Sequence, residues 1–360
     1  MRLSALVPLL LPFSIADDWG PYGEVCLADQ PSLYDPLLFT SVPWFTIDLD
    51  LPPRLRWEWV AQSYGDKMKA ALKVVKGMIE GVGGDGAWEM VTILMTDSID
   101  RINEPFLEEI KAIAEVADMS VTELTLMNLF YEIAKACTSI VAQDKDGNMI
   151  HGRNQDFGTF FFWNPKTRTW DLTTALKDLV INMQFVRGGK MVFKGVSFAG
   201  HMGILTGLKP NAFTVTVNSR FGSAETGLFN FLLHGLHDMN FLVFAIRDML
   251  THHDTFEDAT AFMENVPLIA PGYLIMSGSK PGQGVVITRA TNGSDHVDSV
   301  DVSKPNGWVG QNRIGLQGLY QVLSGKPNLN KATVYTAVMD VNKGILQSVI
   351  RTCDDPCWFV

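Results

Sequence analysis

Apolar residues follow a helical period in the first part of the chain. Between about residues 57 and 136 they recur three and four positions apart, the spacing of one helix face, as in the set Met68, Ala71, Leu72, Val75 and Met78. Ser120 and Glu123 form a capping box, which marks the start of a further helix. The pattern therefore predicts a series of helices, the last of which extends to residues 135–136.

The pattern changes to strands from Cys137 onward, where short apolar runs are separated by polar turns. The strand pairs expected are 137–143 with 148–154, 181–187 with 190–196, 201–208 with 212–218, and 333–338 with 345–351. Further strands are expected at 273–276 and 284–289, and helices at 228–237, 241–252 and 256–266. Hairpins followed by helices and then by more strands predict an α+β fold in which packed sheets carry helices on the outside.

Composition and charge exclude several classes of function. The 360 residues include 29 Lys+Arg and 39 Asp+Glu, a formal net charge of −10, whereas nucleic-acid binding needs a basic face. With 47% hydrophobic and 19% charged residues the chain is expected to fold rather than remain disordered. His234 and His237 lie three apart without an evident third ligand, so no metal or cofactor is predicted.

The first 16 residues have the features of a secretory signal peptide. Arg2 precedes an apolar run from Leu3 to Ile15, and Ala16 offers a small residue for cleavage. The run is shorter than the roughly 18 residues that a membrane-spanning helix needs. We therefore expect a secretory or lysosomal lumen, and Asn292, in the sequence Asn-Gly-Ser, as a glycan acceptor.

The cysteines are Cys26, Cys137, Cys353 and Cys357. In an oxidising lumen an even number suggests disulfides, here with three possible pairings. Cys353 and Cys357 flank a tight turn and can approach to disulfide distance. If they pair with each other, either Cys26 and Cys137 form a second disulfide or Cys137 remains a reactive thiol.

The first hairpin places polar groups next to Cys137. If its loop covers 144–147, the pairing counted outward brings Cys137 opposite Asn154, with Arg153 and Asp156 within a residue or two of the thiol. A slip of one residue would decide which of the two shares its face. A cation beside a cysteine lowers the pKa of the thiol, and a carboxylate can orient an amine or hold the arginine. The combination favours a nucleophilic cysteine over a structural one.

His151 is the alternative base for a cysteine–histidine dyad, but the same counting places it nearer to residues 139–142 than to the thiol. An aromatic run follows the hairpin, and Trp57 and Trp59 precede the helices. For these aromatic residues we expect core packing. The alternative is an acyl-chain wall for the run after the hairpin and a lipid-contacting surface for Trp57 and Trp59. The run consists of Phe157, Phe160, Phe161, Phe162 and Trp163.

The segment from Cys137 to Gly158 resembles the nucleophile segment of the acid ceramidase and N-acylethanolamine acid amidase family, which belongs to the N-terminal nucleophile hydrolases. The resemblance covers nearly the whole chain after residue 16. Other matching segments are Val42–Pro53, Phe198–Gly200, Leu329–Thr336 and Cys353–Cys357. It implies an αββα layered sandwich with a mainly helical N-terminal chain packed on it.

The resemblance also implies a maturation step and roles for several residues. In this family the precursor cleaves itself before the cysteine, here between Ala136 and Cys137, into an α-chain (17–136) and a β-chain (137–360). The new α-amine of Cys137 would serve as the base. Arg153 would stabilise the thiolate and the oxyanion, Asp156 would orient the amine, and Asn312 matches the position of an oxyanion asparagine.

The expected activity is that of a lysosomal or secreted amidase. It would hydrolyse the N-acyl bond of ceramide through a cysteine thioester at an anionic lysosomal membrane, with a lipid-transfer activator protein as a further partner. Two departures from the family pattern stand out: Ser219 replaces a glutamate, and the region 308–324 is shorter. They leave two alternatives, an N-acylethanolamine amidase and a ceramidase-like isoform that binds lipid without turnover.

Overall fold

The computed structural model describes residues 34–133, 136–144, 146–157, 163–220, 239–300 and 315–357, except the side chains of residues 130–136. Several sequence predictions lie outside the described residues. They are the signal peptide 1–16, Cys26, Phe160, Phe161, Phe162, the helix 228–237 with His234 and His237, and Asn312.

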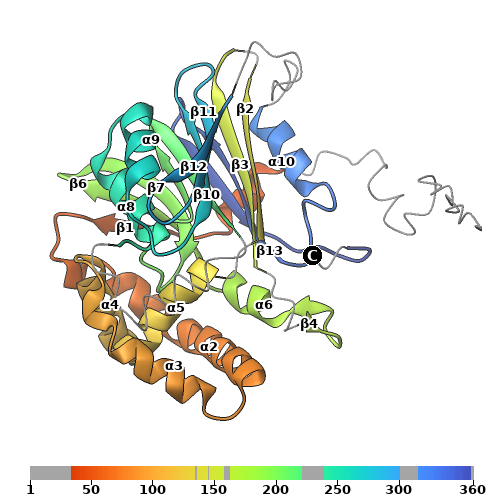
Figure 1. Ribbon diagram of the computed structural model, residues 1–360. Helices are drawn as coiled ribbons and strands as arrows, with labels where there is room; N and C mark the ends of the chain where they lie inside the picture. The colour runs from red at the N-terminus through yellow and green to blue at the C-terminus, as the bar shows by residue number, and fades with distance from the viewer. Residues whose placement is uncertain are drawn as a thin grey trace, which may run out of the picture.

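Two β-sheets form the centre of the molecule (Figure 1). The smaller sheet has the order β14-β13-β3-β2 and contains β2 (Ala136–Gln143), β3 (Met149–Asp156), β13 (Thr333–Asp340) and β14 (Ile345–Ile350). The larger contains β1 (Trp44–Asp48), β6 (Val180–Arg187), β7 (Lys190–Phe198), β8 (Thr206–Lys209), β9 (Phe213–Ser219), β10 (Gly272–Gly278), β11 (Gly284–Arg289) and β12 (Ser294–Ser299). Its strands follow the order β1-β6-β7-β8-β9-β10-β11-β12.

Helices cover the outer face of each sheet. On the larger sheet, α8 (Leu242–His252) packs on β7 and β8, and α9 (Phe256–Asn265) packs on β10. On the smaller sheet, α10 (Leu316–Ser324) packs on β3 and β13. Apolar side chains such as Ala337 and Phe198 fill the space between the sheets and are fully buried. The predicted αββα layering is therefore confirmed.

The N-terminal helices pack together at one end of the sheets (Figure 1). They are α2 (Glu58–Gly83), α3 (Ala87–Thr96), α4 (Phe106–Ala117) and α5 (Val121–Ile133). The apolar set on α2, from Met68 to Met78, is buried as its spacing predicted. The predicted capping box is also present, since Ser120 N–H donates to Glu123 Oε2 at 3.0 Å and Glu123 N–H donates to Ser120 Oγ at 3.1 Å. No described helix is long and apolar enough to cross a membrane.

The short elements complete the fold. They are the helix α6 (Asp171–Lys177), the hairpin of β4 (Trp163–Asn164) and β5 (Thr169–Trp170), and the 3-10 turns Pro36–Thr40, Pro53–Leu55 and Ile99–Arg101. Phe157 is a fully buried core residue and packs edge-on against Phe198. Trp163 is half-buried and packs against Trp170.

Two sequence predictions around the first hairpin are wrong. The last N-terminal helix does not reach residue 136, because Ala136 pairs with Asp156 in the ladder of β2 and β3. The register also differs by one residue, since Cys137 lies opposite Gln155 rather than Asn154. The loop is tighter than assumed: Asp144 N–H donates to Asn148 O at 2.9 Å, and Gly147 takes a φ of 85°, a left-handed conformation that glycine adopts without strain.

Candidate active site

The actual register places four polar side chains on one face of the smaller sheet. Residues directly opposite each other share a face, as do residues two apart on one strand. Cys137 and Ser139 of β2 therefore lie beside Gln155 and Arg153 of β3. This face points toward the larger sheet, because Arg153 Nη1 donates to Leu205 O at 2.9 Å.

Two nitrogen donors converge on the Cys137 sulfur. Arg153 Nη2 lies 2.9 Å from Sγ, and Gln155 Nε2 lies 3.3 Å from it. Both side chains are fully buried, whereas Cys137 is half-buried. Donors of this kind favour the thiolate over the neutral thiol, because the anion is the stronger acceptor.

Arg153 is a buried cation without an acidic partner in the described part of the chain. Its side-chain nitrogens bond the Leu205 carbonyl, the Gln155 amide oxygen and the Cys137 sulfur, and its Nε has no hydrogen-bond partner there. A buried charge is costly unless an opposite charge compensates it. The Cys137 thiolate is the anion in position to do so.

Asp156 ends β3 and lies opposite Ala136, the residue before Cys137. Its Oδ2 accepts a hydrogen bond from Asn330 Nδ2 at 3.2 Å, while Oδ1 is buried without a partner in the described residues. Burial raises the pKa of Asp156 to about 6, although Thr333, Asn330 and the charge of Arg153 act in the opposite direction. Oδ1 is therefore in position to accept a hydrogen bond from a further donor.

A chain of hydrogen bonds ties β2, the strand that carries Cys137, to the larger sheet. Asn218 Nδ2 donates to the Cys137 carbonyl oxygen at 3.1 Å, and Asn218 Oδ1 accepts from Ser139 Oγ at 3.1 Å. Thr216 Oγ1 donates to Ser139 Oγ at 2.8 Å and lies 3.1 Å from His151 Nε2. These bonds fix the backbone that carries the thiol.

His151 belongs to that chain rather than to the sulfur. Its Nδ1 lies 2.9 Å from Thr214 Oγ1, so both ring nitrogens are occupied by threonine hydroxyls of β9. Burial and the charge of Arg153 lower the pKa of His151 to about 3. The ring is therefore neutral at mildly acidic pH, and His151 does not form a dyad with Cys137.

Sequence reasoning did not single out Gln155, Asn218 or Asn330. Gln155 could have been found from the correct register, since it is the residue paired with Cys137. Asn218 and Asn330 come from β9 and from the segment before β13, and no local pattern links either of them to the hairpin.

The other predicted positions are distributed over the surface and the C-terminus. Cys353 and Cys357 form a disulfide with a Cα–Cα distance of 5.9 Å, which confirms that pairing. Asn292 is exposed in the turn between β11 and β12. Ser219 ends β9 opposite Gly272. No described group of three or more His, Cys, Asp or Glu side chains is arranged to hold a metal ion.

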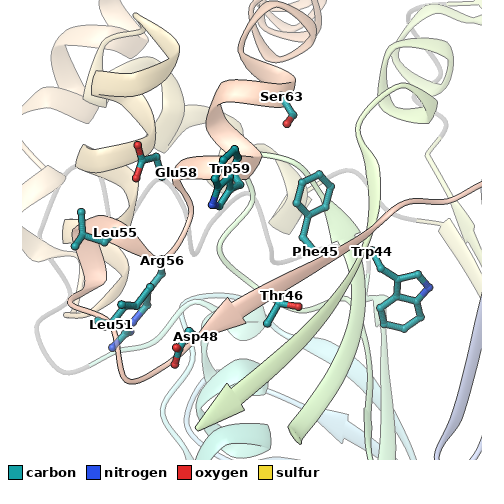
Figure 2. A pocket seen from close by; sticks show the side chains of 10 residues that line it. All are labelled: Trp44, Phe45, Thr46, Asp48, Leu51, Leu55, Arg56, Glu58, Trp59 and Ser63. Carbon is teal, nitrogen blue, oxygen red and sulfur yellow. Dashed lines mark hydrogen bonds between the residues drawn. The ribbon is translucent and has the colours of Figure 1, made fainter. Parts of the chain in front are cut away.

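A separate groove of about 640 Å³ lies between β1 and the start of α2, where Phe45 and Trp59 stand on its two sides (Figure 2). Trp59 is 76% exposed and Leu55 is 53% exposed. Trp57 is buried as predicted, whereas the expectation of core packing is wrong for Trp59. Residues Trp44, Phe45, Thr46, Asp48, Leu51, Leu55, Arg56, Glu58, Trp59 and Ser63 line the groove.

Two protein-family models match separate parts of the chain. Residues 40–102 match the beta subunit of N-acylethanolamine-hydrolyzing acid amidase. Residues 137–295 match the linear amide C–N hydrolases of the choloylglycine hydrolase family, and this match begins at Cys137. Together with the αββα fold, these matches define an N-terminal nucleophile hydrolase that acts on linear amide C–N bonds.

Individual relatives narrow this class. The acid ceramidase of Homo sapiens is 36% identical over 375 residues, covering 96% of this chain and 95% of the human protein. A probable acid ceramidase of Caenorhabditis elegans is 34% identical over 92% of this chain and 91% of its own length. The chain belongs to the acid ceramidase family.

A solved structure is also similar. The Caenorhabditis elegans ortholog of N-acylethanolamine-hydrolyzing acid amidase superposes with a TM-score of 0.50 at 26% identity. The superposition covers 60% of this chain and 100% of that chain.

Proposed function

We propose that this protein is a lysosomal amidase that hydrolyses the N-acyl bond of ceramide to sphingosine and a free fatty acid. The observation that carries the proposal is the buried Arg153 guanidinium, which lies 2.9 Å from the Cys137 sulfur without an acidic partner in the described residues. The similarity to acid ceramidases over 96% of the chain supports the choice of substrate.

The proposed maturation is cleavage between Ala136 and Cys137. The Cys137 sulfur attacks the Ala136 carbonyl carbon, the C–N bond breaks, and the nitrogen takes up a proton to become the α-amine. Water then hydrolyses the thioester and leaves a carboxylate on Ala136. Asp156 lies opposite Ala136, and its Oδ1 has no hydrogen-bond partner among the described residues, so this oxygen is placed to accept a hydrogen bond from the new amine.

In the mature enzyme, nucleophile and base belong to one residue. The α-amine takes the thiol proton, and the thiolate attacks the amide carbonyl of the lipid. Arg153 stabilises the Cys137 thiolate and the nearby oxyanion, and Asn312 is the proposed hydrogen-bond donor to that oxyanion. The amine then protonates the leaving sphingoid nitrogen, the C–N bond breaks, and water hydrolyses the acyl thioester.

The exposed groove side chains suggest how a lipid is reached. Trp44, Leu55 and Trp59 are apolar and exposed beside the groove (Figure 2), and tryptophan is enriched at membrane interfaces. The sequence pI of about 5.2 means that repulsion from anionic membranes falls in an acidic lumen. We place the anionic lysosomal membrane and a lipid-transfer activator protein among the partners, and a glycan on exposed Asn292.

Two experiments test the proposed function. Intact-mass analysis of the purified protein should show two chains divided at Ala136 and Cys137, and Cys137→Ala should remain a single chain without activity. Assay of ceramide and of an N-acylethanolamine at acidic pH should show a preference for ceramide. Activity retained in Cys137→Ala would refute the role of Cys137 as the nucleophile.

A second candidate, N-acylethanolamine hydrolysis, is favoured by the match of residues 40–102 and by the superposed amidase structure. A strong preference for the ethanolamide in that assay would select it. A single chain that binds ceramide without turnover would instead select the lipid-binding isoform, for which Ser219 and the short 308–324 region are the motivation.

A further inference from the structure

A side-chain amide lies at the centre of the site. Gln155 is paired with Cys137 on one side, in β2, and with Tyr335 on the other, in β13. Its side chain is fully buried. A buried amide requires hydrogen-bond partners for its oxygen and its nitrogen, so the identity of those partners defines what it does.

The orientation of the amide follows from its neighbours. Arg153 Nη2 donates to Gln155 Oε1, and Gln155 Nε2 donates to Cys137 Sγ at 3.3 Å. The reverse orientation would point the amide N–H groups at a guanidinium, which has donors only. The Arg153 contact therefore fixes the oxygen, and the nitrogen is left to face the sulfur.

An amide in this position differs from a carboxylate in one respect that matters for catalysis. A carboxylate would hold Arg153 and also neutralise its charge, whereas an amide holds it and leaves the charge available. The described contacts of Arg153 are neutral groups and the Cys137 sulfur.

We propose that Gln155 is a further catalytic residue of the amidase: its oxygen fixes Arg153, and its nitrogen supplies the second hydrogen bond to the Cys137 thiolate. This inference rests on the proposed function, because it takes Cys137 as the nucleophile. Loss of the amide should leave the groove between β1 and α2 unchanged and shift the Cys137 sulfur from thiolate toward neutral thiol.

The test compares Gln155→Met and Gln155→Glu with the wild-type mature protein. Methionine keeps the length of the side chain and removes both hydrogen bonds. Glutamate keeps the acceptor for Arg153, removes the donor to the sulfur and adds a negative charge. Gln184→Met is the matched control, because Gln184 bonds Thr46 Oγ1 on the larger sheet at 2.7 Å.

Two readouts are measured for each variant. The first is the rate of Cys137 alkylation by iodoacetamide against pH, followed by the mass of the Cys137 peptide. The second is kcat and KM for amide hydrolysis. Loss of a hydrogen bond to a charged group corresponds to a change of about 10- to 100-fold in an equilibrium constant or a rate.

In Gln155→Met, the alkylation midpoint should therefore rise by about one pH unit and kcat should fall about 10- to 100-fold, while KM changes less than about threefold. Gln155→Glu should be affected more than Gln155→Met, because its carboxylate neutralises Arg153 and repels the thiolate. Gln184→Met should behave as wild type.

Wild-type alkylation and kcat in Gln155→Met would overturn the proposal, as would wild-type behaviour in Gln155→Glu. If Gln155→Met does not fold, Gln155→Glu gives the same test, because it retains the Arg153 contact. A failure of the proposed function is distinguishable, since wild-type protein would then stay active after complete Cys137 alkylation.

Discussion

Replacing Glu109 by glutamine removes a buried carboxylate charge from a cluster that joins α4 to α8. Arg247 Nη2 lies 2.7 Å from Glu109 Oε1, its Nη1 bonds the other carboxylate oxygen, and Arg56 Nη1 lies 3.0 Å from Oε1. The Arg247 guanidinium also lies 5.1–5.5 Å from the rings of Trp57, Phe106 and Phe185. The glutamine variant fills the same space and removes the carboxylate that both arginines contact.

The size of the effect follows from burial. Glu109 is fully buried and Arg247 is 2% exposed, and removing one partner of such a pair costs about 3–5 kcal/mol. The neighbouring Glu108 provides a matched control, because it pairs with Lys111 at 3.1 Å and with Arg54 at 3.7 Å on the surface. Exposed pairs contribute about 0.2–1 kcal/mol.

Urea unfolding of the intact precursor measures the difference between the two variants. Glu109→Gln should lower the unfolding midpoint by about 1 M or more, whereas Glu108→Gln should change it by a few tenths of 1 M. On the proposed self-cleavage before Cys137, size-exclusion chromatography should show that Glu109→Gln releases one of the two chains more readily than wild type. Equal midpoints for the two variants would show that the buried cluster does not hold α4 and α8 together.

Three further perturbations address the site, the pH response and the C-terminus. Arg153→Met should abolish processing and lower kcat at least about 100-fold, as loss of an oxyanion donor does, and turnover near wild type would contradict its role. Burial raises the pKa of Asp248 to about 6 from an ordinary 3.8, so the contribution of Asp248 to stability falls as the pH rises from about 4 to 6. Urea unfolding should therefore show that the free energy of unfolding of Asp248→Asn, relative to that of wild type, is about 1–3 kcal/mol higher at pH 7 than at pH 4. An equal difference at both pH values would show that Asp248 does not cause this pH dependence. Replacing Cys353 and Cys357 together by serine should cost about 2 kcal/mol for so short a loop without moving the Cys137 alkylation profile, and a shifted profile would mean that the disulfide reaches the active site.

Elements encoded by local patterns were predictable from the sequence. The helix α2 follows from its apolar period, and the hairpin of β6 and β7 follows from Gly188 and Gly189, both of which take positive φ values. Strand β1 was not predicted, because it has five residues and pairs with β6, which is more than 130 positions away. Its conformation depends on that partner rather than on its own pattern.

The candidate site was predictable only in part. Spacing alone brought Arg153 and Asp156 near Cys137, but the register needed the loop geometry at Asp144 and Gly147. That geometry moved Arg153 onto the face of the thiol and identified Gln155 as its neighbour. Asn330, which holds Asp156 at 3.2 Å, comes from 174 positions away along the chain, where no periodic signal could indicate the contact.

Strand β1 has a consequence for assembly. It lies before Cys137 in the chain, yet it forms the edge of the larger sheet through five parallel residue pairs with β6. On the proposed cleavage, the N-terminal fragment would complement the sheet of the other fragment by donating a strand, as in donor-strand exchange. The two pieces should then acquire their fold as one polypeptide, and separately produced pieces should fail to reconstitute it when mixed.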